Sequence, residues 1–184
     1  YAVSALLVLL VTTAAAAIGS FPTFETAGTI FDLGISHGVV LASVIASLGG
    51  IHWWSTKIAR QPANEALGRV APLVLLVGSL AVVVADVVSG FAGEGAELHA
   101  DWTGGIEAMN WVALVGIGVV ALGLLTSLGA VLPALKAGED VPADPWEGQT
   151  LEWLAPSPPP LANFDGDLAP VTSAEPLVDL RQEK

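Results

Sequence analysis

Residues 70–92 read VAPLVLLVGSLAVVVADVVSGFA, and Asp86 carries the one charge in this stretch. Three further stretches with few charges occupy residues 1–19, 29–54 and 107–135. About 20 apolar residues in an α-helix span the ~30 Å hydrocarbon core of a bilayer, where the helix satisfies its own backbone polar groups. The sequence therefore predicts an all-α membrane fold, with four transmembrane helices in residues 1–135.

The composition agrees with this prediction, because only 13% of the residues are charged, against about 25% in typical soluble domains. The chain has no cysteine, so disulfides and thiolate metal sites are excluded and a metal would need His or carboxylate ligands. The first residue is Tyr1 and the single methionine is Met109. We therefore expect the sequence to be a fragment of a longer protein whose earlier helices precede it.

The distribution of charge indicates how the helices are oriented. The basic residues lie between the second and third helices and in the tail; they are Lys57, Arg60, Arg69, Lys136, Arg181 and Lys184. The stretch between the third and fourth helices is acidic and contains Glu94, Glu97 and Asp101. Lys and Arg are enriched in cytoplasmic loops of membrane proteins. We therefore predict a multi-pass protein of the cell's inner (plasma) membrane with a cytoplasmic C-terminal tail. Its expected partner is the lipid bilayer and not nucleic acid.

The tail, residues 136–184, differs sharply from the helices in composition. It holds ten acidic residues and eight prolines, too many for it to bury enough apolar surface to fold by itself. A proline-rich segment with Trp146, Trp153 and Phe164 can still lie in an extended conformation along a folded partner. We predict an extended, acidic, Pro-rich tail that is ordered on such a partner.

Three ionisable residues, Asp32, His37 and Asp86, fall inside the predicted helices. Each costs roughly 2.5–3.5 kcal/mol at the centre of a membrane helix, which makes it a candidate functional residue. The predicted orientation places all three in the outer half of the membrane. His37 could ligate a metal through one ring nitrogen while a neighbour holds the other. Alternatively, Asp32 is solvated at the interface, and Asp86 bonds His37 or Ser89 as a contact between helices.

Residues 144–160, DPWEGQTLEWLAPSPPP, resemble the end of subunit I of the haem-copper terminal oxidases. Pro170-Val171 and residues 173–177 continue the resemblance. It implies the last four of the family's twelve helices, with the tail on the cytoplasmic face. It also implies a part of subunit I of an aa3-type cytochrome c oxidase, which transfers electrons from cytochrome c to dioxygen and couples this to proton translocation. The implied partners are the rest of subunit I, the other oxidase subunits and cytochrome c.

Aligning residues 28–31 and 49–54 with the family, with one gap, places His37 on the axial ligand of the low-spin haem. Ile35 then occupies the position of the histidine that binds the high-spin haem. Ala27 and Gly28 replace a His-Asp magnesium pair, and residues 96–97 replace an Arg pair that holds haem propionates. The resemblance thus implies low-spin haem through His37, and high-spin haem and copper whose ligands are absent or outside this chain. No catalytic residue is assigned.

Two other interpretations remain. A degenerate, non-catalytic subunit of a respiratory complex would lack haem, and Asp86 would simply neutralise His37. A proton-coupled transporter would use Asp32, His37 and Asp86, but it leaves the tail unexplained. Under the oxidase interpretation given above, the chain is an enzyme only as part of a complete oxidase and not as this fragment alone.

Overall fold

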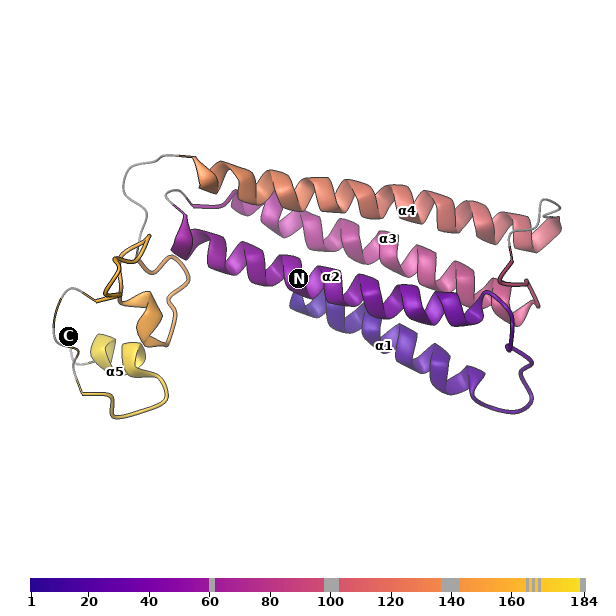
Figure 1. The fold of residues 1–184 in the computed structure, drawn as a ribbon, viewed down its shortest axis with the longest axis horizontal. Coiled ribbons are helices and arrows are strands. Elements are labelled where there is room, and N and C mark those ends of the chain that lie inside the picture. Colours follow the sequence, from indigo (N-terminus) through magenta and orange to yellow (C-terminus); the bar gives the residue numbers. More distant parts are fainter. Residues whose placement is uncertain are drawn as a thin grey trace. The chain divides into compact units, whose positions relative to one another are not determined.

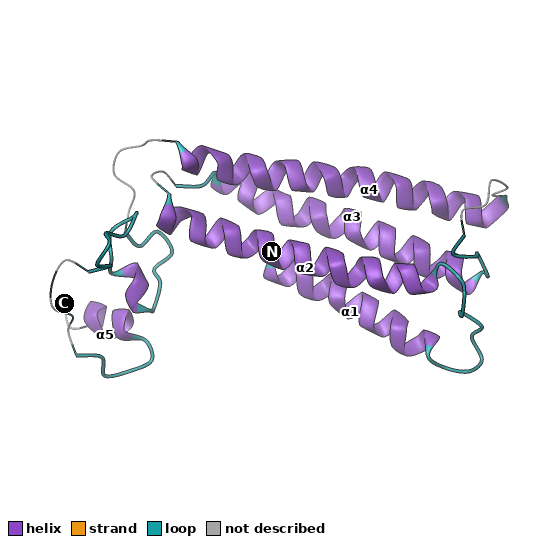
Figure 2. Ribbon diagram, viewed as in Figure 1, coloured by secondary structure: helices purple, strands orange, loops and turns teal. Residues whose placement is uncertain are grey.

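The computed structural model describes residues 1–59, 62–97, 103–136, 143–164, 166, 168 and 170–182. Its long helices are α1 (Ala2–Gly19), α2 (Phe31–Ile58), α3 (Glu65–Phe91) and α4 (Gly104–Val131), and α4 continues into the 3-10 helix η1 (Leu132–Leu135). The tail adds the 3-10 helix η2 (Leu151–Trp153) and the short helix α5 (Pro176–Gln182). Within the described residues there are helices and loops and no strand (Figures 1 and 2).

All four long helices are long and apolar enough to cross a membrane, which confirms the predicted all-α membrane fold. Their ends differ from the apolar stretches: α2 continues to Ile58, and α3 begins at Glu65 instead of residue 70. A helix can extend past the hydrocarbon because its backbone hydrogen bonds are internal. Glu65 in the first turn of α3 also interacts favourably with the positive end of the helix dipole.

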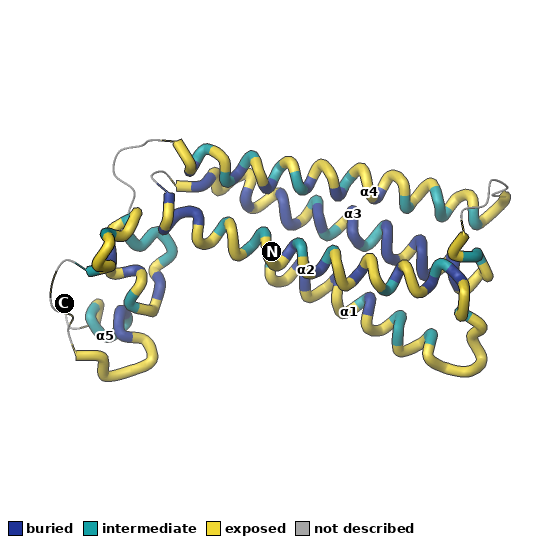
Figure 3. The backbone as a smooth tube through the Cα atoms, in the orientation of Figure 1, coloured by how far each residue is buried: buried dark blue, intermediate teal, exposed yellow. Residues whose placement is uncertain are grey.

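The chain forms two compact units, residues 1–49 with 66–128, and residues 50–65 with 129–184. In the first unit, called the bundle here, successive helices are neighbours and α3 is the most buried helix (Figures 1 and 3). Its central apolar cluster takes side chains from all four helices: Ala5, Val8, Ala42, Ile45, Leu75 and Val120. The outward faces of α1, α2 and α4 are largely apolar, as expected of helices that face lipid or further helices.

Small residues set the distance between α3 and α4. A Cβ atom added to Gly78 would lie 2.7 Å from the backbone N of Val120 and 2.9 Å from the carbonyl O of Gly116. These two backbones are therefore in direct contact, as at other membrane helix pairs with small residues at the interface. Gly118, two residues from Gly116, has no neighbouring atom within 4 Å of such a Cβ.

The loop before α2 and the loop after α3 meet at one end of the bundle. The backbone N–H of Ile30 donates to the carbonyl of Glu94 at 2.9 Å, and that of Ala96 donates to the carbonyl of Gly28 at 3.1 Å. The ring of Phe91 at the end of α3 lies 5.0 Å from the ring of Phe31 at the start of α2. These contacts hold the first turns of α2 against the last turns of α3.

The second unit, called the tail unit here, combines the end of α2 with the tail. The ring of Trp146 stacks on that of Trp53 at 5.5 Å, and Trp153 meets Trp53 edge-on at 5.4 Å and stacks on Trp54 at 6.0 Å. The indole N–H of Trp146 donates to the Oγ1 of Thr56 at 2.9 Å. The composition predicted an extended tail, whereas the structure has a compact unit. The reason is that the aromatic end of α2 supplies apolar surface that the tail lacks.

Two cations complete the tail unit. Lys57 is buried, and its Nζ donates to the carbonyls of Ala143, at 2.9 Å, and Ala155, while it lies 5.4 Å from the centre of the Trp153 ring. Arg181 on α5 pairs with Asp144 and donates to the carbonyl of Gly148 at 2.8 Å. Lys57 is buried and therefore needs several acceptors, which the backbone carbonyls of the tail provide.

Candidate functional site

The imidazole of His37 on α2 and the carboxylate of Asp86 on α3 form a hydrogen-bonded contact in the bundle. The Nδ1 of His37 lies 2.7 Å from the Oδ2 of Asp86. The side chain of Asp86 is 7% exposed, whereas that of His37 is 50% exposed. One edge of the imidazole therefore contacts a buried carboxylate, and the rest of the ring lies at the surface of the bundle.

Two glycines allow this contact by bringing the backbones of α2 and α3 together. A Cβ added to Gly34, one turn before His37, would lie 2.8 Å from the Cβ of Asp86 and 3.3 Å from the backbone N of Val87. A Cβ at Gly90 would lie 2.6 Å from the Cβ of Phe31. The side chain of Asp86 is short, so it reaches His37 only because α2 has no side chain at position 34.

The hydrogen bond determines which nitrogen of His37 is available. A carboxylate accepts hydrogen bonds, so a neutral His37 carries its proton on Nδ1 and an unshared pair on Nε2; this tautomer is inferred from the hydrogen-bond partner. Among the described residues, Asp86 is the hydrogen-bond partner of the ring, and it takes Nδ1 alone. Metal-binding histidines have this same arrangement, in which a carboxylate holds one N–H and the other nitrogen is the ligand.

The third predicted intramembrane residue, Asp32, does not join this pair by a hydrogen bond within the described part of the chain. It is exposed in the first turn of α2, where its backbone carbonyl accepts a bond from the Oγ of Ser36 at 2.9 Å. Ser89, the other partner considered for Asp86, is buried and its Oγ has no partner among the described atoms. The structure therefore pairs Asp86 with His37 and not with Ser89.

At the positions of the high-spin ligand and of the magnesium pair in the resemblance, Ile35, Ala27 and Gly28 carry no side chain that could bind a metal. Ile35 packs on an apolar cluster of Phe31, Val83 and Val87. Gly28 and Ala96 are joined through their backbones. In the described residues, no three His, Cys, Asp or Glu side chains gather where they could hold a metal ion. A metal bound through His37 would need its remaining ligands from outside the described residues.

The sequence did not point to a second polar contact in the bundle. The Nδ2 of Asn110 on α4 donates to the Oε1 of Glu94, just after α3, at 2.8 Å. One signal was present, since Asn110 is an amide in an otherwise apolar stretch. Its partner could not be identified, because three acidic residues of the intervening stretch were equally plausible.

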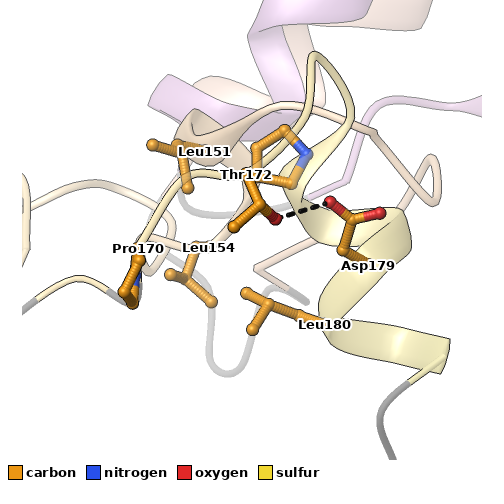
Figure 4. A pocket seen from close by; sticks show the side chains of 7 residues that line it. Leu151, Leu154, Pro170, Thr172, Asp179 and Leu180 are labelled. Atoms are coloured by element: carbon orange, nitrogen blue, oxygen red, sulfur yellow. Dashed lines mark hydrogen bonds between the residues drawn. The ribbon is translucent and has the colours of Figure 1, made fainter.

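Figure 4 shows a cavity of about 190 Å³ in the tail unit, between η2 and α5. Its lining combines leucine and proline side chains with Thr172 and Asp179, and the carboxylate of Asp179 accepts hydrogen bonds from Thr172 at 3.4 Å and Ser173 at 2.6 Å. These bonds stabilise the start of α5. The one carboxylate among the described lining residues is thus engaged within the tail unit, and we take His37 with Asp86 as the candidate site.

Comparison with known proteins agrees with the resemblance of the tail. The chain is 30% identical to cytochrome c oxidase subunit 1 of Bacillus subtilis (strain 168) over 139 residues, which cover 74% of this chain and 22% of that protein. It is 28% identical to the same subunit of Alkalihalophilus pseudofirmus over 153 residues, 81% of this chain and 24% of that one. Ubiquinol oxidase subunit 1 of Acetobacter aceti is 28% identical over 147 residues, 77% of this chain and 22% of that one. No family model matches the chain.

These similarities and the four apolar helices define an integral membrane protein related to respiratory oxidases. The chain belongs to the subunit I family of the haem-copper terminal oxidases. It spans less than a quarter of the length of the relatives that it matches.

Proposed function

We propose that this chain forms the last four transmembrane helices and the tail of subunit I in an aa3-type cytochrome c oxidase. The complete assembly would transfer electrons from cytochrome c to dioxygen and couple this to proton translocation. Support comes from the similarity to cytochrome c oxidase subunit 1 over 74% of the chain and from the four apolar helices. The activity belongs to the complete oxidase, because the chain corresponds to about 22% of such a subunit.

Within this assembly, His37 is proposed to be an axial ligand of the low-spin haem through Nε2. The observation that carries this proposal is the geometry of the ring, with Nδ1 on Asp86 and the remaining edge at the bundle surface. When bound, the haem supplies a group that accepts and releases single electrons. The chain's own contribution is to bind the iron at Nε2 and to hold the ring there. Ile35 stands where the ligand of the high-spin haem is expected. Its side chain is apolar, packs on Val83 and Val87 of α3, and has no atom that could bind iron.

The proposed partners and location follow from the same assignment. They are the rest of subunit I, the other oxidase subunits and cytochrome c as electron donor; ubiquinol is the alternative donor, because ubiquinol oxidase subunits are also among the relatives. The protein would lie in the plasma membrane with its tail in the cytoplasm, since basic residues gather on the side of the tail.

The ligand assignment can be tested on the complex purified from native membranes through an affinity tag on this chain. Pyridine haemochrome analysis and the low-spin absorbance band would be compared for the native protein, His37→Ala and Ser36→Ala. We expect His37→Ala to lose the low-spin haem. Ser36 is a matched control, because it adjoins His37 and its Oγ donates to the carbonyl of Asp32 on the same helix. Full retention of low-spin haem in His37→Ala would remove the assignment.

Two observations favour a second function: Ile35 stands where the high-spin haem ligand is expected, and the carboxylate of Asp86 contacts His37. A non-catalytic subunit of a respiratory complex could retain the helices, lose the high-spin ligand, and use Asp86 to neutralise His37. This function predicts that the native complex contains no haem held by this chain. The haem content of the unmodified protein therefore separates the two functions before any variant is made.

A further inference from the structure

We propose that Asp86 is a positioning residue that fixes the tautomer and the orientation of His37, so that Nε2 is presented to the haem. This inference rests on the proposed function of His37. Its basis is the 2.7 Å contact between His37 Nδ1 and Asp86 Oδ2, in which the carboxylate is almost fully buried and the imidazole is half-exposed. A buried carboxylate on the most buried helix is a fixed point against which a surface ring can be oriented.

The polar neighbours of the pair do not share this role. The hydroxyl of Ser36 donates to the carbonyl of Asp32, and that of Thr12, on α1, donates to the carbonyl of Val8. The hydroxyl of Ser89, one turn after Asp86, is buried without a partner in the described structure. Among the described residues, Asp86 is thus the group that holds the imidazole through a hydrogen bond.

The close approach of the helices makes this contact specific. Because a Cβ at Gly34 would lie 2.8 Å from the Cβ of Asp86 and 3.3 Å from the backbone N of Val87, any side chain there forces α2 and α3 apart. Gly34→Val should therefore weaken the contact without changing either partner. This variant acts on the geometry alone and is independent of the charge of Asp86.

The carboxylate also has a chemical consequence for a ligand. Accepting the Nδ1–H bond increases the electron-donor strength of Nε2, and such outer partners typically change metal affinity on the order of 10–100-fold when mutated. A stronger donor favours the oxidised iron, so it lowers the reduction potential of a haem. An amide at position 86 would keep a hydrogen-bond acceptor but remove the negative charge.

The test uses the purified complex with Asp86→Asn, Asp86→Leu, Gly34→Val and the control Ser89→Ala. We expect Asp86→Asn to retain the low-spin haem with a higher reduction potential, measured by spectroelectrochemical titration. Asp86→Leu and Gly34→Val should bind the haem on the order of 10–100-fold more weakly. Ser89→Ala should match the native complex, since its hydroxyl is equally buried but makes no hydrogen bond in the described structure.

The outcomes separate this inference from the proposed function. If His37→Ala loses the low-spin haem but Asp86→Leu and Gly34→Val bind it as tightly as the native complex does, His37 is a ligand and the inference about Asp86 is wrong. A native potential in Asp86→Asn would refute the effect of its negative charge on the haem. If His37→Ala keeps the haem, or the native complex has none, both are wrong. Should Asp86→Leu fail to assemble, haem binding by Gly34→Val still decides, because that variant weakens the contact and keeps both partners.

Discussion

The bundle and the tail unit are stabilised in different ways. In the bundle, helices approach through small residues such as Gly34 and Gly78, and hydrogen bonds between side chains are few. In the tail unit, a buried lysine, an arginine and stacked tryptophans hold a chain with little regular structure. Lipid is as apolar as the helix surfaces, so close packing has to stabilise the bundle. An acidic, Pro-rich segment in water has to use aromatic burial and backbone acceptors instead.

The largest expected effect is on the tail unit, from Lys57→Ala. Removal of the ammonium leaves the carbonyls of Ala143 and Ala155 without their donor, at about 1–3 kcal/mol for each buried group left unpaired. The contact with the Trp153 ring is lost as well. We expect faster limited proteolysis within residues 143–182, followed by mass spectrometry of the fragments.

Lys136→Ala is the matched control for this variant, because Lys136 is an exposed lysine in the same unit. Its digestion pattern should equal that of the native chain. Equal protection of Lys57→Ala and the native protein would show that the tryptophans and Arg181 hold the tail without Lys57, and the contrast drawn between the two regions would need revision.

An intermediate effect is expected in the bundle from Gly78→Ala. The new methyl group would meet the backbone of α4 at 2.7 Å from Val120 N, and such overpacking typically costs about 1–3 kcal/mol. The control is Gly118→Ala, where nothing lies within 4 Å, and where alanine stabilises a helix by up to about 1 kcal/mol. Thermal unfolding of the complex in detergent should give a lower Tm for Gly78→Ala only. A Tm reduced equally by both substitutions would contradict the backbone contact between α3 and α4.

The smallest effect should come from Asp32→Asn. Asp32 is exposed in the first turn of α2, and surface substitutions of this kind usually change stability by no more than about 0.5 kcal/mol. We expect the Tm and the haem content of the complex to be unchanged. Proton translocation that proceeds in proteoliposomes without oxygen consumption, and that is lost in Asp32→Asn, would instead support the transporter interpretation in which Asp32, His37 and Asp86 act together.

Several features could be predicted from the sequence because they depend on composition along one segment. The four spans follow from the length of the apolar stretches, and they were confirmed. The relationship to oxidase subunit I follows from the order of residues in the tail, and it was confirmed by the similarity to known subunits. His37 and Asp86 were identifiable as candidates because ionisable residues are costly in a membrane helix.

Other features could not be predicted, since they depend on which faces of the segments meet. His37 and Asp86 are 49 positions apart. The sequence alone did not show whether the hydrogen-bond partner of Asp86 is His37 or Ser89. Likewise, the sequence showed Lys57 only as one of the basic residues between two helices. Its carbonyl partners are 86 and 98 positions away, so they could not be inferred from the local sequence. The apolar pattern also placed the start of α3 near residue 70, because hydropathy does not register polar turns that continue a helix.

The amino-acid sequence by itself determined that this chain carries four helices apolar enough to cross a membrane and that it is related to oxidase subunits, because hydropathy and motif order are properties of a single stretch of chain. Only the tertiary structure decided that Asp86 holds the Nδ1 of His37 and leaves Nε2 unbonded among the described residues. The rotation of each helix about its axis is set by the packing of its neighbours, here by the missing side chain at Gly34. That rotation determines which polar groups come within hydrogen-bond distance.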